Sequence, residues 1–179
     1  MSGSDSAALV LARSTACVGL GLCAGLTWSV PAWTWPALYR PDSTLAPAQR
    51  LAIWSKLYLQ GKSTMIALVP TTSALLVYAA WAVHPPQVYL PAGWVARHRK
   101  GVLGAAATTT LAIFAWTVVA MEGLNGSLKA LERDSTAGRT PVLPSHDALI
   151  RTRWAKLHLV RCVLATTAFV ASVTELALA

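Results

Sequence analysis

Three long stretches of this chain contain no charged residue, and they constrain its fold more than any other feature. Residues 14–39, 65–83 and 101–121 lack Lys, Arg, Asp and Glu. Each approaches or exceeds the roughly 20 residues that a helix needs to cross a membrane. A fourth stretch, from Trp154 to the C-terminus, carries charges only near its two ends. Charged residues make up 12% of the chain, whereas a soluble domain has about a quarter, so the sequence predicts a polytopic integral membrane protein.

Four apolar stretches joined by polar connectors predict an all-α fold, a four-helix transmembrane bundle with up-down-up-down topology. We expect residues 1–179 to form one integral membrane domain, located in the endomembranes if the source is a eukaryote. The predicted spans are approximately residues 8–30, 50–83, 101–124 and 150–177.

Prolines, tryptophans and polar residues predict where the spans end. The first span is expected to end at the tryptophans Trp28, Trp33 and Trp35 and the prolines Pro31 and Pro36, because indoles favour the membrane interface and proline breaks helices. Residues 84–86, which include two prolines, are expected to stop the second span. The polar stretch 126–149 contains Gly, Pro and mixed charges and is predicted to be a surface loop.

The net charge of +8 and the three cysteines exclude several classes of function. The densest basic cluster, residues 97–100, is shorter than a nucleic-acid-binding tract, so we interpret it as a membrane-flanking cluster and predict no nucleic-acid partner. Cys17, Cys23 and Cys162 all lie in apolar stretches and show no C-x-x-C spacing. This pattern argues against a disulfide framework and a zinc site, and we predict that the cysteines are packing residues.

The fourth span opens with an aromatic ring, an imidazole and a guanidinium at helical spacing. Trp154, His158 and Arg161 are spaced i, i+4, i+7, which places them on one face of a helix. An ionisable residue inside a membrane helix is costly, and this cost makes it a candidate functional residue. The alternative for His158 is a histidine that packs between helices and bonds to a backbone carbonyl.

The predicted topology brings most polar residues of the spans to one end of the bundle. The first and third spans end there and the second and fourth begin there, and we call this end the mouth. The residues expected there are Trp28, Trp54, Tyr58, Lys62, Glu122, Asn125, Trp154, His158 and Arg161. Such convergence indicates a site. An ordinary interfacial belt would explain the tryptophans, but it explains Asn125, His158 and Arg161 less well.

Two side-chain arrangements are predicted from these placements. Arg13 and Glu175 should be neighbours at the end away from the mouth, because pairing lowers the cost of burying each charge. Lys62 either snorkels to the lipid headgroups or faces the bundle interior. The residues expected to line the main cavity are Tyr58, Lys62, Asn125, His158 and Arg161.

Four short motifs follow one another along the chain. They are Gly25 with the proline after it at the first exit, Trp54-x-x-x-Tyr58-x-x-Gly61, Met121-x-x-x-Asn125-x-x-Leu128 and Trp154-x-x-x-His158-x-x-Arg161. Together they resemble the anthrone oxygenase-like family of small four-helix membrane proteins, over most of the chain. Gly123 departs from the pattern, which has a proline before the asparagine. The resemblance implies an oxidoreductase, a monooxygenase of secondary metabolism that oxidises an anthrone polyketide to an anthraquinone with molecular oxygen.

The residues can be compared with the chemistry that this resemblance implies. An anthrone that loses a proton from its central methylene gains an aromatic middle ring, and the resulting anthrolate can reduce oxygen. The reaction needs a base, a cation near the developing oxyanion and an aromatic slot. We predict His158 as the base, Arg161 or Lys62 as the cation, Asn125 or Tyr58 as hydrogen-bond donor, and Trp28, Trp54 and Trp154 as stacking residues. Arg161 beside His158 would favour the neutral imidazole that a base at pH 7 must be.

Cofactors and partners are predicted from the same chemistry. We expect no flavin or nicotinamide, with molecular oxygen as co-substrate. A bound metal stays open, with His158 as its ligand, since Glu122 and His146 could join only through folding. The expected partners are an aromatic polyketide small molecule and the lipid bilayer, and the oligomeric state is left open. The alternative function is a non-catalytic membrane scaffold or a lipophilic-ligand-binding protein.

Overall fold

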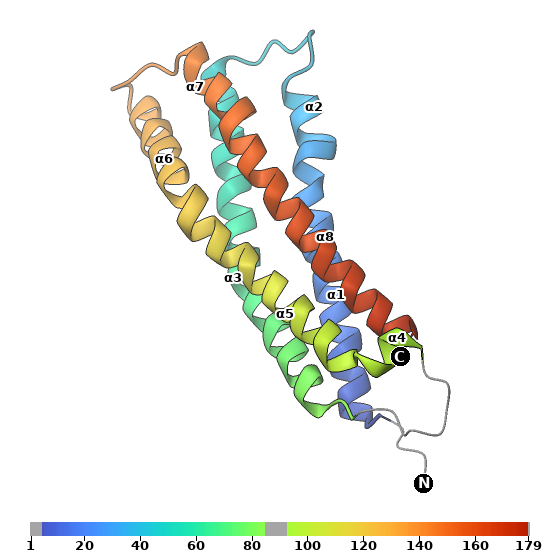
Figure 1. The fold of residues 1–179 in the computed structure, drawn as a ribbon. Helices are drawn as coiled ribbons and strands as arrows, with labels where there is room; N and C mark the ends of the chain where they lie inside the picture. Colours follow the sequence, from blue (N-terminus) through green and yellow to red (C-terminus); the bar gives the residue numbers. More distant parts are fainter. Residues whose placement is uncertain (1–4, 85–92, 179) are drawn as a thin grey trace.

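The computed structural model describes residues 5–84 and 93–178. These residues form helices and no strand, and Figure 1 shows them as an elongated helical bundle. Four continuous helical spans are long and apolar enough to cross a membrane: Ala7–Leu38, Pro47–Ala82, Arg99–Thr136 and Pro144–Leu178. The predicted all-α, four-helix fold is confirmed.

Three of the four spans contain a π-helical turn between α-helical segments. The first span consists of α1 (Ala7–Ser29), the π-helical turn η1 (Val30–Thr34) and α2 (Trp35–Leu38). The second span is the single helix α3 (Pro47–Ala82). The third span follows the short α4 (Trp94–Arg97) and consists of α5 (Arg99–Trp116), η2 (Thr117–Met121) and α6 (Glu122–Thr136). The fourth span consists of α7 (Pro144–Leu149), η3 (Ile150–Trp154) and α8 (Ala155–Leu178).

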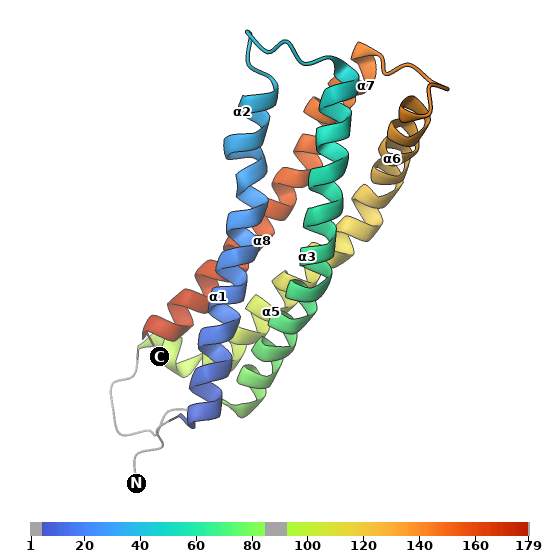
Figure 2. The ribbon, with the colours of Figure 1, turned by 180° about the vertical axis from the view of Figure 1, so that it is seen from behind.

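The spans pack as a closed square. α1 contacts α3 and α8, and α5 contacts the same two helices. In both views the start of α1 and the end of α8 lie at one end, while α7 and the connector after α2 lie at the other (Figures 1 and 2). The order of the spans is therefore up-down-up-down, as predicted, and the mouth is the end that holds α2, α6 and α7.

Small side chains bring the helices together at the end away from the mouth. A Cβ atom added to Gly19 of α1 would lie 2.6 Å from Thr72 Oγ1 of α3, so the two helices approach closely there. This close packing is typical of membrane helices, which gain little from the hydrophobic effect between themselves. The buried residues of this core are Leu9, Ala16, Leu20, Leu76, Ala79, Val83, Leu103, Ala106, Ala107 and Ala168.

Pro31 and Pro36 do not end the first span, contrary to the prediction. Each proline occupies the first turn of its helical segment, where the missing N–H is tolerated. The Trp35 N–H donates to the Val30 carbonyl across Pro31, a bond that spans five residues. The helix therefore continues to Leu38. The second span ends at Ala82, and the two prolines predicted to stop it lie outside the described residues.

Most of the stretch 126–149 is helical, so its prediction as a surface loop was wrong. α6 extends the third span to Thr136, and the fourth span already begins at Pro144. Leu128 is only 2% exposed and packs in the core at the mouth. The burial of Leu128 stabilises α6, whose other faces are polar. The composition of such a helix resembles that of a surface loop, so composition alone does not distinguish the two.

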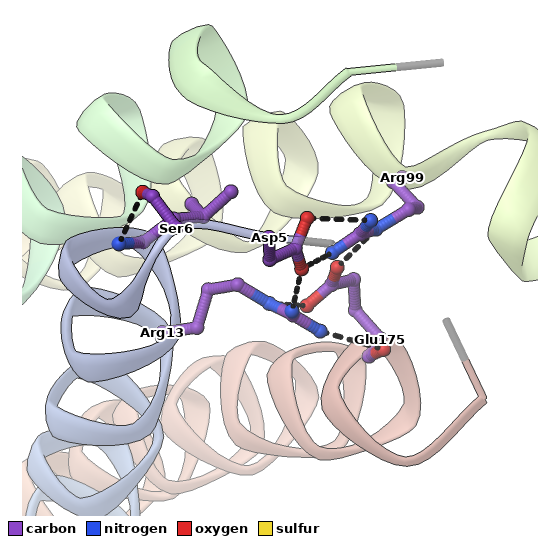
Figure 3. Close-up of polar contacts among 6 residues, drawn as sticks. Asp5, Ser6, Arg13, Arg99 and Glu175 are labelled. Atoms are coloured by element: carbon purple, nitrogen blue, oxygen red, sulfur yellow. Dashed lines mark hydrogen bonds and ion pairs between the residues drawn. The ribbon is translucent and has the colours of Figure 1, made fainter. Parts of the chain in front are cut away.

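A closed ring of four charged side chains locks the end away from the mouth (Figure 3). The Arg13 guanidinium donates to Glu175 at 2.8 Å, which confirms the predicted pair. Arg99 donates to the same carboxylate at 2.9 Å, and both arginines bind Asp5 at 2.6 Å. The hydrogen bond from Arg99 and the two nearby cations hold the pKa of Asp5 below its ordinary value. Two arginines and two carboxylates balance their charges, so Glu175 is tolerated with no exposed surface.

Candidate functional site

A cavity of about 690 Å³ lies between the four spans, from the middle of the bundle toward the mouth. This volume lies within the range of pockets that bind small molecules. Residues of all four spans form its wall, including those of the three π-helical turns. Much of the wall is apolar, and the polar side chains described below interrupt it at a few positions.

The three π-helical turns of the described chain all contribute to this wall. Val30 and Thr34 come from η1, Thr117 and Val118 come from η2, and Trp154 ends η3. π-helical turns occur often at functional sites, because the extra residue disturbs the regular hydrogen-bond ladder and re-aims side chains. Their convergence on one cavity supports its interpretation as the functional site.

Aromatic rings form one continuous part of the wall. Trp154 stacks on His158 with 4.7 Å between ring centroids and 9° between planes. Trp54 stacks on Tyr58 at 5.4 Å and 14°, and it meets Trp154 edge to face at 5.9 Å. All four residues line the cavity. The helical spacing that predicted Trp154 and His158 on one face is thus confirmed.

The imidazole of His158 is held by a backbone carbonyl of the first span. Its Nε2 lies 2.9 Å from the Thr27 carbonyl oxygen. Pro31 has no N–H to donate to that carbonyl, so α1 leaves it available to His158. Because a carbonyl only accepts, Nε2 carries the proton, and the lone pair of a neutral ring is at Nδ1. Nδ1 is buried and has no hydrogen-bond partner among the described residues.

The sequence analysis gave two interpretations of His158. The contact with the Thr27 carbonyl agrees with the second, a histidine that packs between helices and bonds to a backbone carbonyl. Neither Thr27 nor Pro31 was predicted to contact it. A proline four residues after a carbonyl is the signal that could have pointed to Thr27, because it always leaves that carbonyl without its helical donor.

Arg161 lies one helical turn beyond His158 and also lines the cavity. Its Nε is buried without a hydrogen-bond partner, and no ion pair forms between Arg161 and another residue of the described chain. A guanidinium presents several donors in a planar fork, which suits a carboxylate or another oxyanion. The arrangement can hold an anionic oxygen inside the cavity.

A second polar group lines the cavity on the side of α3 and α6. The Tyr58 hydroxyl donates to Glu122 Oε2 at 3.4 Å, and Lys62 Nζ lies 3.8 Å from Glu122 Oε1. All three residues belong to the wall. Lys62 therefore faces the cavity, one of the two placements that the sequence left open, and its charge is paired with a carboxylate.

The model of the anthrone oxygenase family matches residues 54–171, well over half of the chain. The chain belongs to the anthrone oxygenase family. Comparisons with curated proteins and with solved structures give no match. The family match contains the motifs that begin at Trp54, Met121 and Trp154, and it starts after Gly25.

Two of the motifs inside the family match line the cavity, and the third lies behind its wall. Tyr58 and Gly61 of the first motif are lining residues, as are His158 and Arg161 of the last. Asn125 was predicted to line the cavity as well, but it has no exposed surface and is absent from the wall. Its Oδ1 accepts the indole N–H of Trp154 at 2.9 Å. Asn125 therefore positions the tryptophan that stacks on His158.

Trp28 was predicted to stack on a ligand, and the structure places it elsewhere. It is 40% exposed, and its indole N–H donates to Thr166 Oγ1 on α8 at 2.8 Å. The preceding residue Thr27 occupies the inward face of α1, and one residue along a helix turns a side chain by about 100°. Trp28 therefore lies outside the cavity wall. Trp35, which was predicted only as an interfacial residue, packs against Trp154 at 5.4 Å instead.

A polar cluster at the mouth joins three segments that the sequence analysis treated separately. Asp147 of α7 accepts from the Tyr39 hydroxyl and from Arg50 of α3, both at 2.9 Å. Arg151 lies over the Tyr39 ring, 5.0 Å from its centroid. Burial and the hydrogen bond to Asp147 raise the pKa of Tyr39. Because Asp147 lies in the stretch predicted as a loop, no sequence signal pointed to this cluster.

The residues considered for a metal lie apart from one another. His146 accepts a hydrogen bond from the Leu143 N–H at 3.2 Å at the start of α7, and Glu122 is engaged with Tyr58 and Lys62. Across the ranges 5–84 and 93–178, no three His, Cys, Asp or Glu side chains gather as metal ligands do. The expectation of no cofactor, with a bound metal left open, stays a prediction.

Proposed function

We propose that the protein oxidises an anthrone-type aromatic polyketide to the corresponding anthraquinone with molecular oxygen. Membership of the anthrone oxygenase family supports a reaction of this class. The observation that carries the proposal is Arg161, a cation without an ion-pair partner in the described chain, on the wall of an apolar and aromatic cavity. A cation in this position can stabilise the oxyanion that forms when an anthrone loses a proton.

The shape and chemistry of the wall suit a flat, lipophilic substrate. Trp54 and Trp154 belong to the wall but are only 2% and 4% exposed, so they support it from behind, and apolar side chains provide most of its surface. The volume of about 690 Å³ suits a small molecule. Leu57, Ile66 and Phe114 line the cavity and are 37%, 54% and 52% exposed. Because these partly exposed residues belong to the apolar spans, we propose that a substrate that partitions into the bilayer enters the cavity between them.

The proposed reaction balances without a further oxidant. The substrate loses one proton from its central methylene, and the electron pair of that C–H bond enters the ring system to form the anthrolate. The anthrolate passes one electron to oxygen, and the resulting radical pair combines to form a C–O bond. The peroxide takes up the proton, and the hydroperoxide loses water to leave the new carbonyl group. One oxygen atom enters the product and the other leaves as water.

The wall contains candidates for each role in this reaction. Arg161 faces the developing oxyanion in the proposal. Two side chains could accept the substrate proton, namely the imidazole of His158 predicted from the sequence and the carboxylate of Glu122. Lys62 is less suited to hold the oxyanion than Arg161, because Glu122 already pairs with it.

Oxygen uptake by the purified protein with an anthrone, against a boiled control, tests the proposal. Arg161→Lys should lower kcat by about 100-fold or more, because a point charge does not reproduce a planar donor fork and one oxyanion donor is worth roughly that much. Arg153→Lys is the matched control, since Arg153 is exposed on the same span and does not line the cavity. Binding of the anthrone without oxygen uptake would instead support a lipophilic-ligand carrier.

A further inference from the structure

We infer that Glu122, with Tyr58 as its hydrogen-bond partner, is the base that removes the substrate's proton. The inference rests on the proposed function and assigns the base for the first step of its reaction. It departs from the sequence-based expectation, which gave this role to His158. The geometry of the two side chains carries the argument.

The nitrogens of His158 are poorly placed to meet a substrate. Nε2 is committed to the Thr27 carbonyl at 2.9 Å, which requires its proton to stay there. Nδ1 holds the lone pair but is buried, with no partner in the described part of the chain. Trp154 covers one face of the ring at 4.7 Å. The bond to Thr27 and the stacking on Trp154 therefore hold the ring in place, as expected for a positioning residue of the wall.

The carboxylate of Glu122 is open to the cavity. Its side chain is 46% exposed, and it is the only carboxylate that lines the cavity in the described part of the chain. Tyr58 donates to one oxygen at 3.4 Å and Lys62 approaches the other at 3.8 Å. Both distances are long for charge-assisted contacts, so a substrate can displace or shorten them without breaking a strong bond.

The position of Glu122 in the fold supports the same role. It is the first residue of α6 and directly follows the π-helical turn η2. The preceding residue, Met121, has no exposed surface and anchors this point of the helix in the core. A group for proton transfer needs such a rigid support next to an open cavity.

Carboxylates are effective bases toward carbon-bound protons when fixed groups stabilise the oxyanion that forms. In the proposed step the C–H bond of the central methylene breaks and the proton bonds to a carboxylate oxygen of Glu122. The electron pair passes into the rings, and the oxyanion faces Arg161. After oxygen has added, Glu122 returns the proton to the peroxide, and the hydroperoxide loses water.

Matched glutamine variants separate the two bases. Glu122→Gln should lower kcat by about 100-fold or more, because a general base contributes roughly that much. His158→Gln keeps an N–H that can donate to the Thr27 carbonyl but removes the basic nitrogen, and it should lose less activity than Glu122→Gln. Glu132→Gln changes the same residue type on α6 outside the cavity wall and should resemble wild type. Unchanged thermal stability of each variant confirms its fold.

Chemical rescue by a small base distinguishes a catalytic role from a structural one. Formate should restore part of the activity of Glu122→Ala, because a small carboxylate can occupy the vacated space, and imidazole should not rescue His158→Ala. Rescue by imidazole, or a fully active Glu122→Gln, would overturn the inference and leave the proposed function intact. Wild-type protein that takes up no more oxygen than the boiled control would instead overturn the proposed function itself.

Discussion

Removing one charge from the ring of Asp5, Arg13, Arg99 and Glu175 should destabilise the fold strongly without touching the cavity. Glu175→Gln keeps the shape of the side chain but leaves two arginines with one carboxylate. Glu175 has no exposed surface, and its carboxylate binds the arginines at 2.8 and 2.9 Å. Breaking a buried ion pair from one side costs about 3–5 kcal/mol. For a chain of this length, that cost corresponds to a fall in Tm of about 6–20 °C.

The assay is thermal unfolding in detergent, with Asp134→Asn as the control. Asp134 also binds an arginine, Arg139, at 2.7 Å, but the two side chains are 42% and 64% exposed. Such an exposed pair contributes at most about 1 kcal/mol. Glu175→Gln should also retain its activity per folded molecule, because the ring lies away from the cavity. Equal Tm shifts for the two variants would refute the assignment of a stabilising role to this buried ring.

Three further predictions concern the cavity, its supporting shell and acid stability. Leu57→Trp should lower kcat/KM about tenfold or more by filling part of the cavity, whereas Leu59→Trp, on an exposed position outside the wall, should not; steady-state kinetics compare them. Asn125→Ala should lower the unfolding free energy by about 1–3 kcal/mol, because the Trp154 indole loses its acceptor. The hydrogen bond from an arginine lowers the pKa of Asp5. Its stabilisation should thus be complete above about pH 4 and disappear as pH falls through the lowered pKa, and Asp5→Asn should reduce this acid sensitivity in pH-dependent unfolding.

The sequence predicted those features that depend on burial cost and helical spacing. The long apolar runs predicted four membrane helices. The cost of burying a single charge in an apolar span predicted that Arg13 and Glu175 pair with each other. The i, i+4, i+7 spacing placed Trp154, His158 and Arg161 on one face, and all three line the cavity. These predictions needed no knowledge of how the helices end.

The errors arose where backbone hydrogen bonding departs from the regular α-helix. Pro31 was expected to break the first span, but the π-helical turn absorbs it and leaves the Thr27 carbonyl to His158. Trp28 was assigned to the mouth from its position near the end of the first span, without regard to its helical face, and it lies one residue, or about 100°, from the inward-facing Thr27. Asn125 illustrates a different limit. Residue spacing predicts which helix face a side chain occupies, but not whether another side chain, here Trp154, lies between it and the cavity.

Incubation of an anthrone with the purified protein under ¹⁸O₂ tests the central claim most directly. The account predicts protein-dependent formation of the anthraquinone with one ¹⁸O atom in the new carbonyl group and one oxygen molecule consumed per product. A parallel incubation with a chelator tests whether the reaction depends on a bound metal, which the sequence left open. Boiled protein sets the rate of uncatalysed oxidation. Product that carries oxygen from water, or that forms no faster than with boiled protein, would contradict the account.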